Sequence, residues 1–282
     1  MTESQETANP WEQREHENEL IQLRMGKVKH KIAVISGKGG VGKSLVTVNL
    51  AALLAKDRRE GRVAIFDADL TGPCVPKMMG LKDVKLMAGP PGIFPAVGAE
   101  GVKVISMALF LPSDDSPVIW RGPLKMGAIR QFLAEVAWGP LDYLLVDLPP
   151  GTGDESLSVL QLLPEMDGVV IVTIPSEVSQ SVVKKAITFA RKMDVPIFGI
   201  VENMSGMICP HCGETIEVFS KGGGQRVAEE MDVEFLGSIP LDPRISADSD
   251  EGTPFVIRHP DSPASKAFRE IVEKIEEKVN EG

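Results

Sequence analysis

The sequence lacks several features that would place it in common classes of protein. It has no apolar run of about eighteen residues that would span a membrane, and no apolar core near its N-terminus that would act as a secretion signal. Positive charge is in deficit, since 30 Lys and Arg against 40 Asp and Glu give a net charge of −10. That balance argues against a nucleic-acid partner held by bulk electrostatics. We therefore expect a soluble, cytoplasmic protein that binds neither nucleic acid nor membrane.

What the sequence does contain is a series of buried-strand patterns that alternate with helical ones. Such alternation is typical of an α/β fold with a doubly wound, mostly parallel sheet flanked by helices, in which ligands bind at the carboxyl ends of the strands. Residues 1–29 carry few apolar side chains, so we expect a flexible N-terminal arm or a short docking helix outside the core, and one domain over residues 30–282. The strands are expected at 32–35, 62–67, 102–107, 141–147, 169–174, 197–201 and 235–239, and helices at 45–55, 122–138, 179–192, 223–231 and 265–279.

The first strand and helix enclose a glycine-rich loop that has the pattern G-x-x-x-x-G-K-[ST]. Between a strand and a helix, this pattern forms a phosphate cradle: glycines allow backbone N–H groups to turn onto an anion, and the helix N-terminus adds partial positive charge. Lys43 is expected to reach the β- and γ-phosphates and Ser44 to bind Mg²⁺. Lys38 is a second lysine that a simple cradle does not require. The predicted cradle comprises Gly37, Lys38, Gly39, Gly40, Val41, Gly42, Lys43 and Ser44.

Acidic residues follow two of the predicted strands. Asp147 ends the strand at 141–147 and precedes a Pro/Gly turn, so we expect it to hold Mg²⁺, directly or through water. Asp67 and Asp69 stand at the carboxyl end of the strand at 62–67, and we favour Asp69 for positioning the attacking water because it lies further into the loop. Asp154 has two interpretations of equal weight, a helix cap and a functional group.

The three cysteines are too few for a disulfide framework. Cys209 and Cys212 have C-x-x-C spacing within a knuckle at 207–213, where Gly213 allows the positive φ of a tight turn. Two sulfurs are half of a tetrahedral or cubane site, so the other ligands must come from Cys74, from His211 or from a second copy of the chain. Zinc and an iron–sulfur cluster both fit such ligands, and a redox pair is the alternative.

Two further strand ends carry candidates for the nucleobase. Asn203 follows the strand at 197–201, and its amide is a candidate reader of adenine. Pro240 and Asp242 lie in a rigid loop after the strand at 235–239, which would flank the same base. Both segments also suit ordinary turns.

Together these motifs resemble a known family. Lys38 with Lys43 resembles the deviant phosphate loop of the MinD/ParA/nitrogenase-iron-protein group. Within that group the best match is the Mrp/ApbC family of iron–sulfur cluster carrier ATPases. The matching segments lie at 67–73, 120–123, 147–154, 202–205, 209–212 and 239–242.

The resemblance implies a P-loop ATPase that forms a homodimer, in which Lys38 reaches the nucleotide of the partner subunit. It also implies a [4Fe–4S] cluster bridged by Cys209 and Cys212 of both subunits, and slow ATP hydrolysis coupled to cluster loading or transfer to apo iron–sulfur proteins. By this resemblance Asp69 would act on the attacking water, and Asp147 would bind Mg²⁺. Asn203 and the 240–242 loop would surround the adenine. The alternatives are a regulatory ATPase of the MinD/ParA type and the same dimer with structural zinc. We expect coupling to run through the loop near Asp69 and the turn at 149–154.

Overall fold

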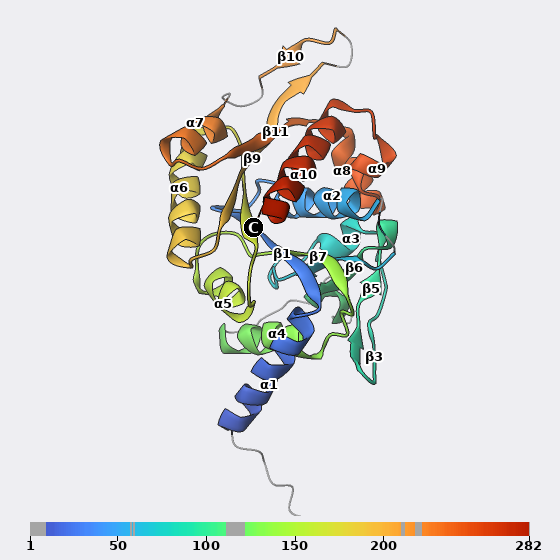
Figure 1. Cartoon of the computed structure of the whole chain (residues 1–282). Helices are drawn as coiled ribbons and strands as arrows, with labels where there is room; N and C mark the ends of the chain where they lie inside the picture. Colours follow the sequence, from blue (N-terminus) through green and yellow to red (C-terminus); the bar gives the residue numbers. More distant parts are fainter. Residues whose placement is uncertain are drawn as a thin grey trace, which may run out of the picture.

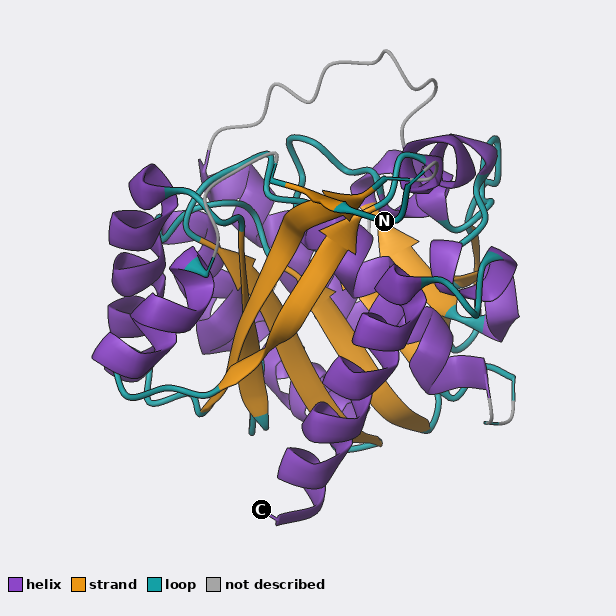
Figure 2. Ribbon diagram, turned by 90° about the horizontal axis from the view of Figure 1, so that it is seen from above, coloured by secondary structure: helices purple, strands orange, loops and turns teal. Residues whose placement is uncertain are grey.

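A computed structural model describes residues 10–56, 58, 60–110, 122–209, 212–217 and 222–281. A nine-stranded sheet runs through it in the order β10-β9-β8-β1-β7-β2-β6-β5, and β11 pairs with β9 (Figures 1 and 2). Neighbouring strands from β9 to β6 are parallel, as is the β9–β11 pair, whereas β5 and β10 join antiparallel. This confirms the expected fold class. The strands are β1 Val28–Ser36, β2 Val63–Asp67, β3 Met87–Gly89, β4 Gly92–Phe94, β5 Ala96–Val97, β6 Lys103–Ser106, β7 Leu141–Asp147, β8 Gly168–Thr173, β9 Ile197–Ile208, β10 Thr215–Ile216 and β11 Phe235–Leu241.

Helices cover both faces of the sheet, as Figure 2 shows. On one face, side chains of α1, α4, α5, α6 and α7 pack on residues such as Ala33 and Ile35 of β1. On the other face α2, α3, α9 and α10 pack on Ile32 and Val34. Because alternate residues of β1 are buried on opposite faces, the strand reads as a continuous apolar run. The α-helices are α1 Pro10–Met25, α2 Lys43–Lys56, α3 Val75–Met78, α4 Gly122–Glu135, α5 Asp154–Leu162, α6 Glu177–Lys192, α7 Gly223–Glu230, α8 Arg244–Glu251, α9 Phe255–Arg258 and α10 Pro263–Glu281, and the 3₁₀ turns are η1 Ala99–Gly101 and η2 Met107–Phe110.

From residue 10 onward the N-terminal segment forms a helix, one of the two structures expected for it. Residues 10–25 form α1, which extends from the base of the molecule in Figure 1 and packs against α4. Ile21 and Met25 are only 2% and 0% exposed, so the expectation that this segment stays outside the core is wrong for them. Trp11, near the start of α1, is 73% exposed. Only the last turns of α1 therefore reach the core, and the apolar pattern of the helix is weak. Residues 1–9 lie outside the described part of the chain.

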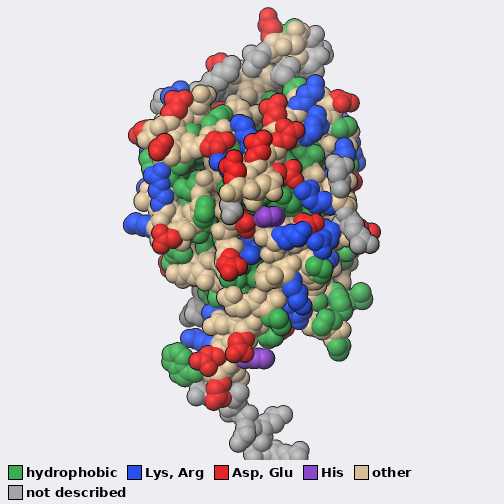
Figure 3. Space-filling model, in the orientation of Figure 1, with side chains coloured by type: hydrophobic (Ala, Val, Ile, Leu, Met, Phe, Trp, Pro, Cys, Tyr) green, Lys and Arg blue, Asp and Glu red, His purple; other side chains and the backbone are tan. Residues whose placement is uncertain are grey.

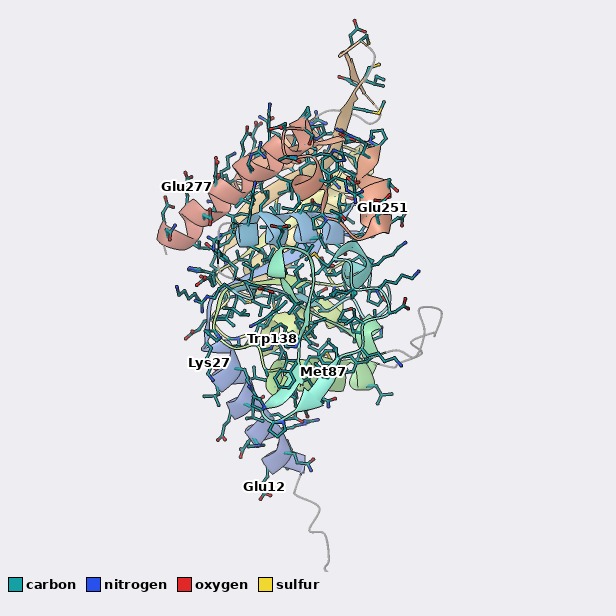
Figure 4. All side chains as sticks on the ribbon, turned by 90° about the vertical axis from the view of Figure 1, so that its right-hand side faces the viewer. Glu12, Lys27, Met87, Trp138, Glu251 and Glu277 are labelled. Carbon is teal, nitrogen blue, oxygen red and sulfur yellow. The ribbon has the colours of Figure 1, made fainter. Side chains whose placement is uncertain are left out.

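Two segments extend beyond the regular layers. Residues 80–100 contain the small β3–β4 hairpin, whose exposed Met87 is labelled in Figure 4, while Trp138 lies buried with its ring at an angle to Phe66. At the opposite end β9 continues well past residue 201 and pairs with β10. The β9–β10 hairpin projects from the body of the molecule (Figures 1 and 4). In the described part of the chain, no helix combines the length and apolarity that a membrane crossing requires.

Candidate functional site

The glycine-rich loop connects the end of β1 to the start of α2, as the sequence predicts. Gly40 and Gly42 have φ of 77° and 80°, in the left-handed region that favours glycine. Gly37 is required for another reason, because a Cβ there would lie 2.4 Å from the main-chain oxygen of Val182 in α6. The loop is therefore curved by two glycines and held against α6 by a third.

The side chains at the start of α2 converge on Asp147. Lys43 Nζ lies 2.7 Å from Asp147 Oδ2, and the exposed fractions of the two side chains are 6% and 0%. Ser44 donates a hydrogen bond to the same carboxylate oxygen, and Thr47 Oγ1 donates to Oδ1 at 2.8 Å. Thr47 was not among the predicted site residues, although its place one turn after Lys43 on the same helix was a signal for it.

This cluster fits a Mg²⁺ site completed by a nucleotide. The hydroxyl of Ser44 and the carboxylate of Asp147 are hard oxygen ligands, which Mg²⁺ prefers, and Mg²⁺ at such sites usually keeps waters and phosphate oxygens as its other ligands. The described residues contain no group of three or more His, Cys, Asp and Glu placed to hold a metal. Two protein oxygens beside a phosphate cradle suit a cation that arrives with its nucleotide.

The two candidate water-positioning acids lie in different surroundings. Asp67 is fully buried and accepts hydrogen bonds from Ser106 Oγ at 2.9 Å and from the backbone N–H of Asp69 at 3.2 Å. Burial first, and then the nearby Asp147 carboxylate, raise the pKa of Asp67 well above its ordinary value, against the opposing effect of Lys43. Asp69 lies at the edge of the core with 9% exposure. The acid nearer to solvent is thus the one that the sequence favoured.

Asp69 also organises its own loop. Its Oδ1 accepts hydrogen bonds from Thr71 Oγ1 at 2.8 Å and from the backbone N–H groups of Thr71 and Gly72 at 3.3 and 3.1 Å. Asp154, by contrast, is exposed in the first turn of α5, and the helix cap is Gly153. Of its two interpretations, that of a side-chain cap is wrong.

Lys38 differs from Lys43 in having no partner within the described chain. Its side chain is partly exposed, and its ammonium group forms no ion pair or hydrogen bond with any residue that the structure describes. Its carbonyl, in contrast, accepts a hydrogen bond from Ser36 Oγ at 3.0 Å, which fixes the backbone at this point. Lys38 thus lies on a loop whose backbone is held by a hydrogen bond, and its ammonium group can pair with another molecule.

The predicted adenine residues fall into two groups. Asn203 is 2% exposed and its amide Nδ2 donates to the carbonyl oxygen of Val41 at 2.9 Å, so in this state it binds the phosphate loop. Pro240 and Asp242 line a cavity of about 470 Å³, together with residues from the start of α10. Arg244 holds both carboxylate oxygens of Asp242, at 2.9 and 2.6 Å, and this contact lowers the pKa of Asp242. A role in adenine binding stays a prediction for all three predicted residues.

The cysteines are separated into two environments. Cys209 and Cys212 lie at the tip of the β9–β10 hairpin, where the backbone N–H of Gly213 donates to the carbonyl of Cys209 at 2.9 Å and Gly213 has φ of 74°. Cys212 is exposed, and all three cysteines are free of disulfides. Cys74 lies at the start of α3 near Ser44, where burial raises the pKa of its thiol. His211 and the segment 120–121, both part of the matched motifs, lie outside the described residues.

One buried acid was missed by the sequence reasoning. Glu202 is fully buried in β9, where Oε2 accepts a hydrogen bond from the backbone N–H of Gly224 at 2.6 Å and Oε1 accepts one from Ser205 at 2.8 Å. It thereby joins β9 to the first turn of α7. The sequence carried a weak signal, an acid next to Asn203 within an apolar strand.

Comparison with known proteins decides the family. A family model of the ParA group, described as NUBPL iron-transfer P-loop NTPase, matches residues 27–276. The chain belongs to this family. A relative from Methanocaldococcus jannaschii, named iron-sulfur cluster carrier protein, is 53% identical over 259 residues, which cover 92% of this chain and 88% of the relative. A protein of the same name from Saccharolobus solfataricus is 52% identical, with 90% and 86% covered. The resemblance to the iron–sulfur cluster carriers is confirmed.

Solved structures of P-loop NTPases share the fold. A nucleotide-binding protein from Archaeoglobus fulgidus, in complex with ADP, superposes with a TM-score of 0.73 at 43% identity, covering 83% of this chain and 91% of that one. The cell division ATPase MinD of Pyrococcus furiosus superposes with a TM-score of 0.60 at 24% identity, covering 88% and 98%. At that identity the second match shows the fold alone.

Proposed function

We propose that this protein is an ATP-hydrolysing carrier that binds a [4Fe–4S] cluster at a homodimer interface and transfers it to apo iron–sulfur proteins. The observation that supports the proposal most directly is the position of two cysteines at the tip of the β9–β10 hairpin. The hairpin presents Cys209 and Cys212 on a projecting element, and the described residues bring no group of three potential metal ligands together. Two thiolates from each of two identical subunits make the tetrathiolate set that such a cluster needs. The names of the relatives support iron–sulfur cargo.

The nucleotide side of the mechanism follows from the cluster around Asp147. ATP places its phosphates in the cradle, and Ser44 and Asp147 would hold the Mg²⁺ that accompanies it, which would supply positive charge to the phosphate oxygens. Lys43 then leaves the Asp147 carboxylate and pairs with phosphate. Asp69 positions the attacking water, and Lys38 places its charge on the nucleotide of the partner subunit, where it stabilises the developing negative charge. Hydrolysis is slow because the site is complete only in the dimer.

Two alternative functions differ from the proposal in the metal at the hairpin or in the partner of the protein. Structural zinc at the hairpin would use the same four thiolates, since zinc also favours tetrahedral sulfur sites. A MinD/ParA-type regulator that binds an anionic membrane is disfavoured by α10, whose exposed face carries acidic side chains over the front of the molecule in Figure 3. The acids on this helix are Glu270, Glu273, Glu276, Glu277 and Glu281.

The experiment is anaerobic reconstitution followed by quantification of iron, sulfide and zinc, with the mass of the assembly measured by light scattering. We expect about four irons and four sulfides per dimer. Cys209→Ser should abolish cluster binding while ATP binding is retained. Cys74→Ser is the matched control, because it removes a thiol that lies near Ser44 and not on the hairpin. Unchanged iron in Cys209→Ser, or a stoichiometric content of zinc alone, would overturn the proposal.

A further inference from the structure

A single strand joins the phosphate loop to the thiol pair. β9 runs from Ile197 inside the sheet to Ile208 in the projecting hairpin, and Cys209 follows directly. A displacement of the middle of this strand therefore occurs within a few residues of the proposed cluster ligands.

The middle of β9 is attached to the phosphate loop through Asn203. Its Nδ2 donates to the carbonyl of Val41 at 2.9 Å, and the contact is buried. Gly42 makes this approach possible, because a Cβ at that position would lie 2.3 Å from Asn203 Nδ2. A phosphate loop that moves when phosphate binds must carry Asn203 with it or break this hydrogen bond.

Beyond Asn203 the strand is irregular. Met204 has φ of 58°, in the left-handed region that costs a non-glycine residue free energy, and Gly206 has φ of 73°. The pairing with β11 shifts at the same point, since Ile239 is opposite Asn203 whereas Leu241 is opposite Met207. Residues 204–206 therefore form a bulge between the attachment point and the hairpin.

The far side of the bulge pairs with two strands. Met207 pairs with Leu241 of β11 and with Ile216 of β10. β11 is held in turn by α10, where Lys274 Nζ donates to the carbonyl of Leu236 at 2.9 Å. Both ends of the bulge thus pair with β11, and the end at Asn203 is attached to the phosphate loop as well.

We propose that Asn203 is a positioning residue that transmits the state of the phosphate loop to the thiol pair, with the bulge at 204–206 as the hinge. This inference deepens the proposed function and rests on it for the identity of the cargo. A displacement of Val41 moves Asn203 together with the segment of β11 that pairs with it, the bulge at 204–206 bends, and the hairpin that carries Cys209 changes its orientation relative to the sheet. This route differs from the expected one through Asp69 and the turn at 149–154. Asn203, which contacts the phosphate loop, and Cys209 lie on the same short segment of chain.

The test uses the cluster-free full chain, so that it does not depend on the cargo. Hydrogen exchange of the backbone amides at 204–209 and the alkylation rate of Cys209 are measured with and without saturating MgADP. The protein concentration is one at which light scattering gives the same mass in both conditions, which removes protection by dimerisation. We expect MgADP to change both rates by about fivefold or more, the lower end of usual coupling between sites. Asn203→Ala should lose the change.

Two further variants keep the test decisive. Met204→Gly relieves the positive φ, so the hinge should yield and the response at Cys209 should shrink even if Asn203→Ala does not fold. Ser238→Ala is the matched control, since Ser238 is exposed on β11 beside the same part of β9 and should respond as the wild type does. A full response in Asn203→Ala, or no response in the wild type, would overturn the coupling. A protein that binds no iron would instead contradict the proposed cluster as cargo, and the coupling between the phosphate loop and Cys209 would not be affected by that result.

Discussion

The buried ion pair between Lys43 and Asp147 gives the sharpest quantitative prediction. The atoms are 2.7 Å apart, with exposed fractions of 6% for Lys43 and 0% for Asp147. Removing one partner of a buried pair usually costs about 3–5 kcal/mol, because the other charge is left buried and unpaired. Asp147 would keep its hydrogen bonds from Ser44 and Thr47, so Lys43→Met should cost about 3 kcal/mol.

The reverse substitution tests the same pair from the other side. In Asp147→Asn the Lys43 ammonium keeps only its hydrogen bond to Ser44 Oγ, at 3.3 Å, so a loss of about 3 kcal/mol is expected again. The double variant removes both charges, and its loss should fall short of the sum by about 2–3 kcal/mol. Thr47→Val, which deletes one hydrogen bond to the Asp147 carboxylate with little change in shape, should cost about 1.5–3 kcal/mol, as is usual for a hydrogen bond to a charged group.

Urea unfolding of the nucleotide-free protein at constant pH measures all four free energies. Losses that add to within about 0.5 kcal/mol would refute the reasoning, because additivity means that the two groups do not interact. Under the proposed function, ATP would separate this pair when Lys43 binds phosphate. Part of the binding free energy would then be used to break the contact between Lys43 and Asp147.

Two other predictions follow from local geometry. Gly37→Ala should destabilise the protein by about 1–3 kcal/mol and weaken ADP binding, because its Cβ would lie 2.4 Å from a main-chain oxygen of α6, whereas Gly39→Ala has 4.0 Å of clearance and should leave unfolding unchanged; equal effects in the two variants would contradict this. The hydrogen bond from Arg62, with a contribution from Lys29, lowers the pKa of Asp142 to about 2, so its stabilisation is complete above its ordinary pKa and is lost as the pH falls toward 2. Asp142→Asn should thus cost about 1 kcal/mol at pH 7 after solvent screening, and the cost should disappear near pH 2; a loss that does not vary with pH would exclude the ion pair as its cause.

The sequence predicted the sheet well because its strands are buried on both faces. Continuous apolar runs such as 32–35 and 141–147 leave little ambiguity, and the acid or glycine after each run marks the carboxyl end of the strand. Lys43 and Ser44 were predicted from the glycine-rich motif and Asp147 from its place at the end of a strand, and the structure places the three side chains in contact.

Contacts that depend on tertiary packing were beyond the sequence. α1 is a mostly polar helix whose last residues are buried because they pack against α4, so composition alone predicted that the segment lies outside the core. β9 was predicted to end before Asn203, because Asn, Ser and Gly in its second half suit a turn. In the structure those residues form the bulge, and the strand resumes beyond it. Antiparallel pairing with β10, a strand of only two residues that the sequence pattern does not reveal, extends the strand.

Strand direction explains why one dimer can complete both unfinished sites. β1 and β9 are each parallel to β8, so the phosphate loop after β1 and the hairpin after β9 lie at the same edge of the sheet. Lys38 on the first has no ionic partner in the described chain, and Cys209 with Cys212 on the second supply two of the four sulfurs that a cluster needs. A second subunit that approaches this edge along a two-fold axis would meet both sites at once. Under the proposed function, nucleotide binding and cluster binding therefore favour the same association, and each should strengthen the other.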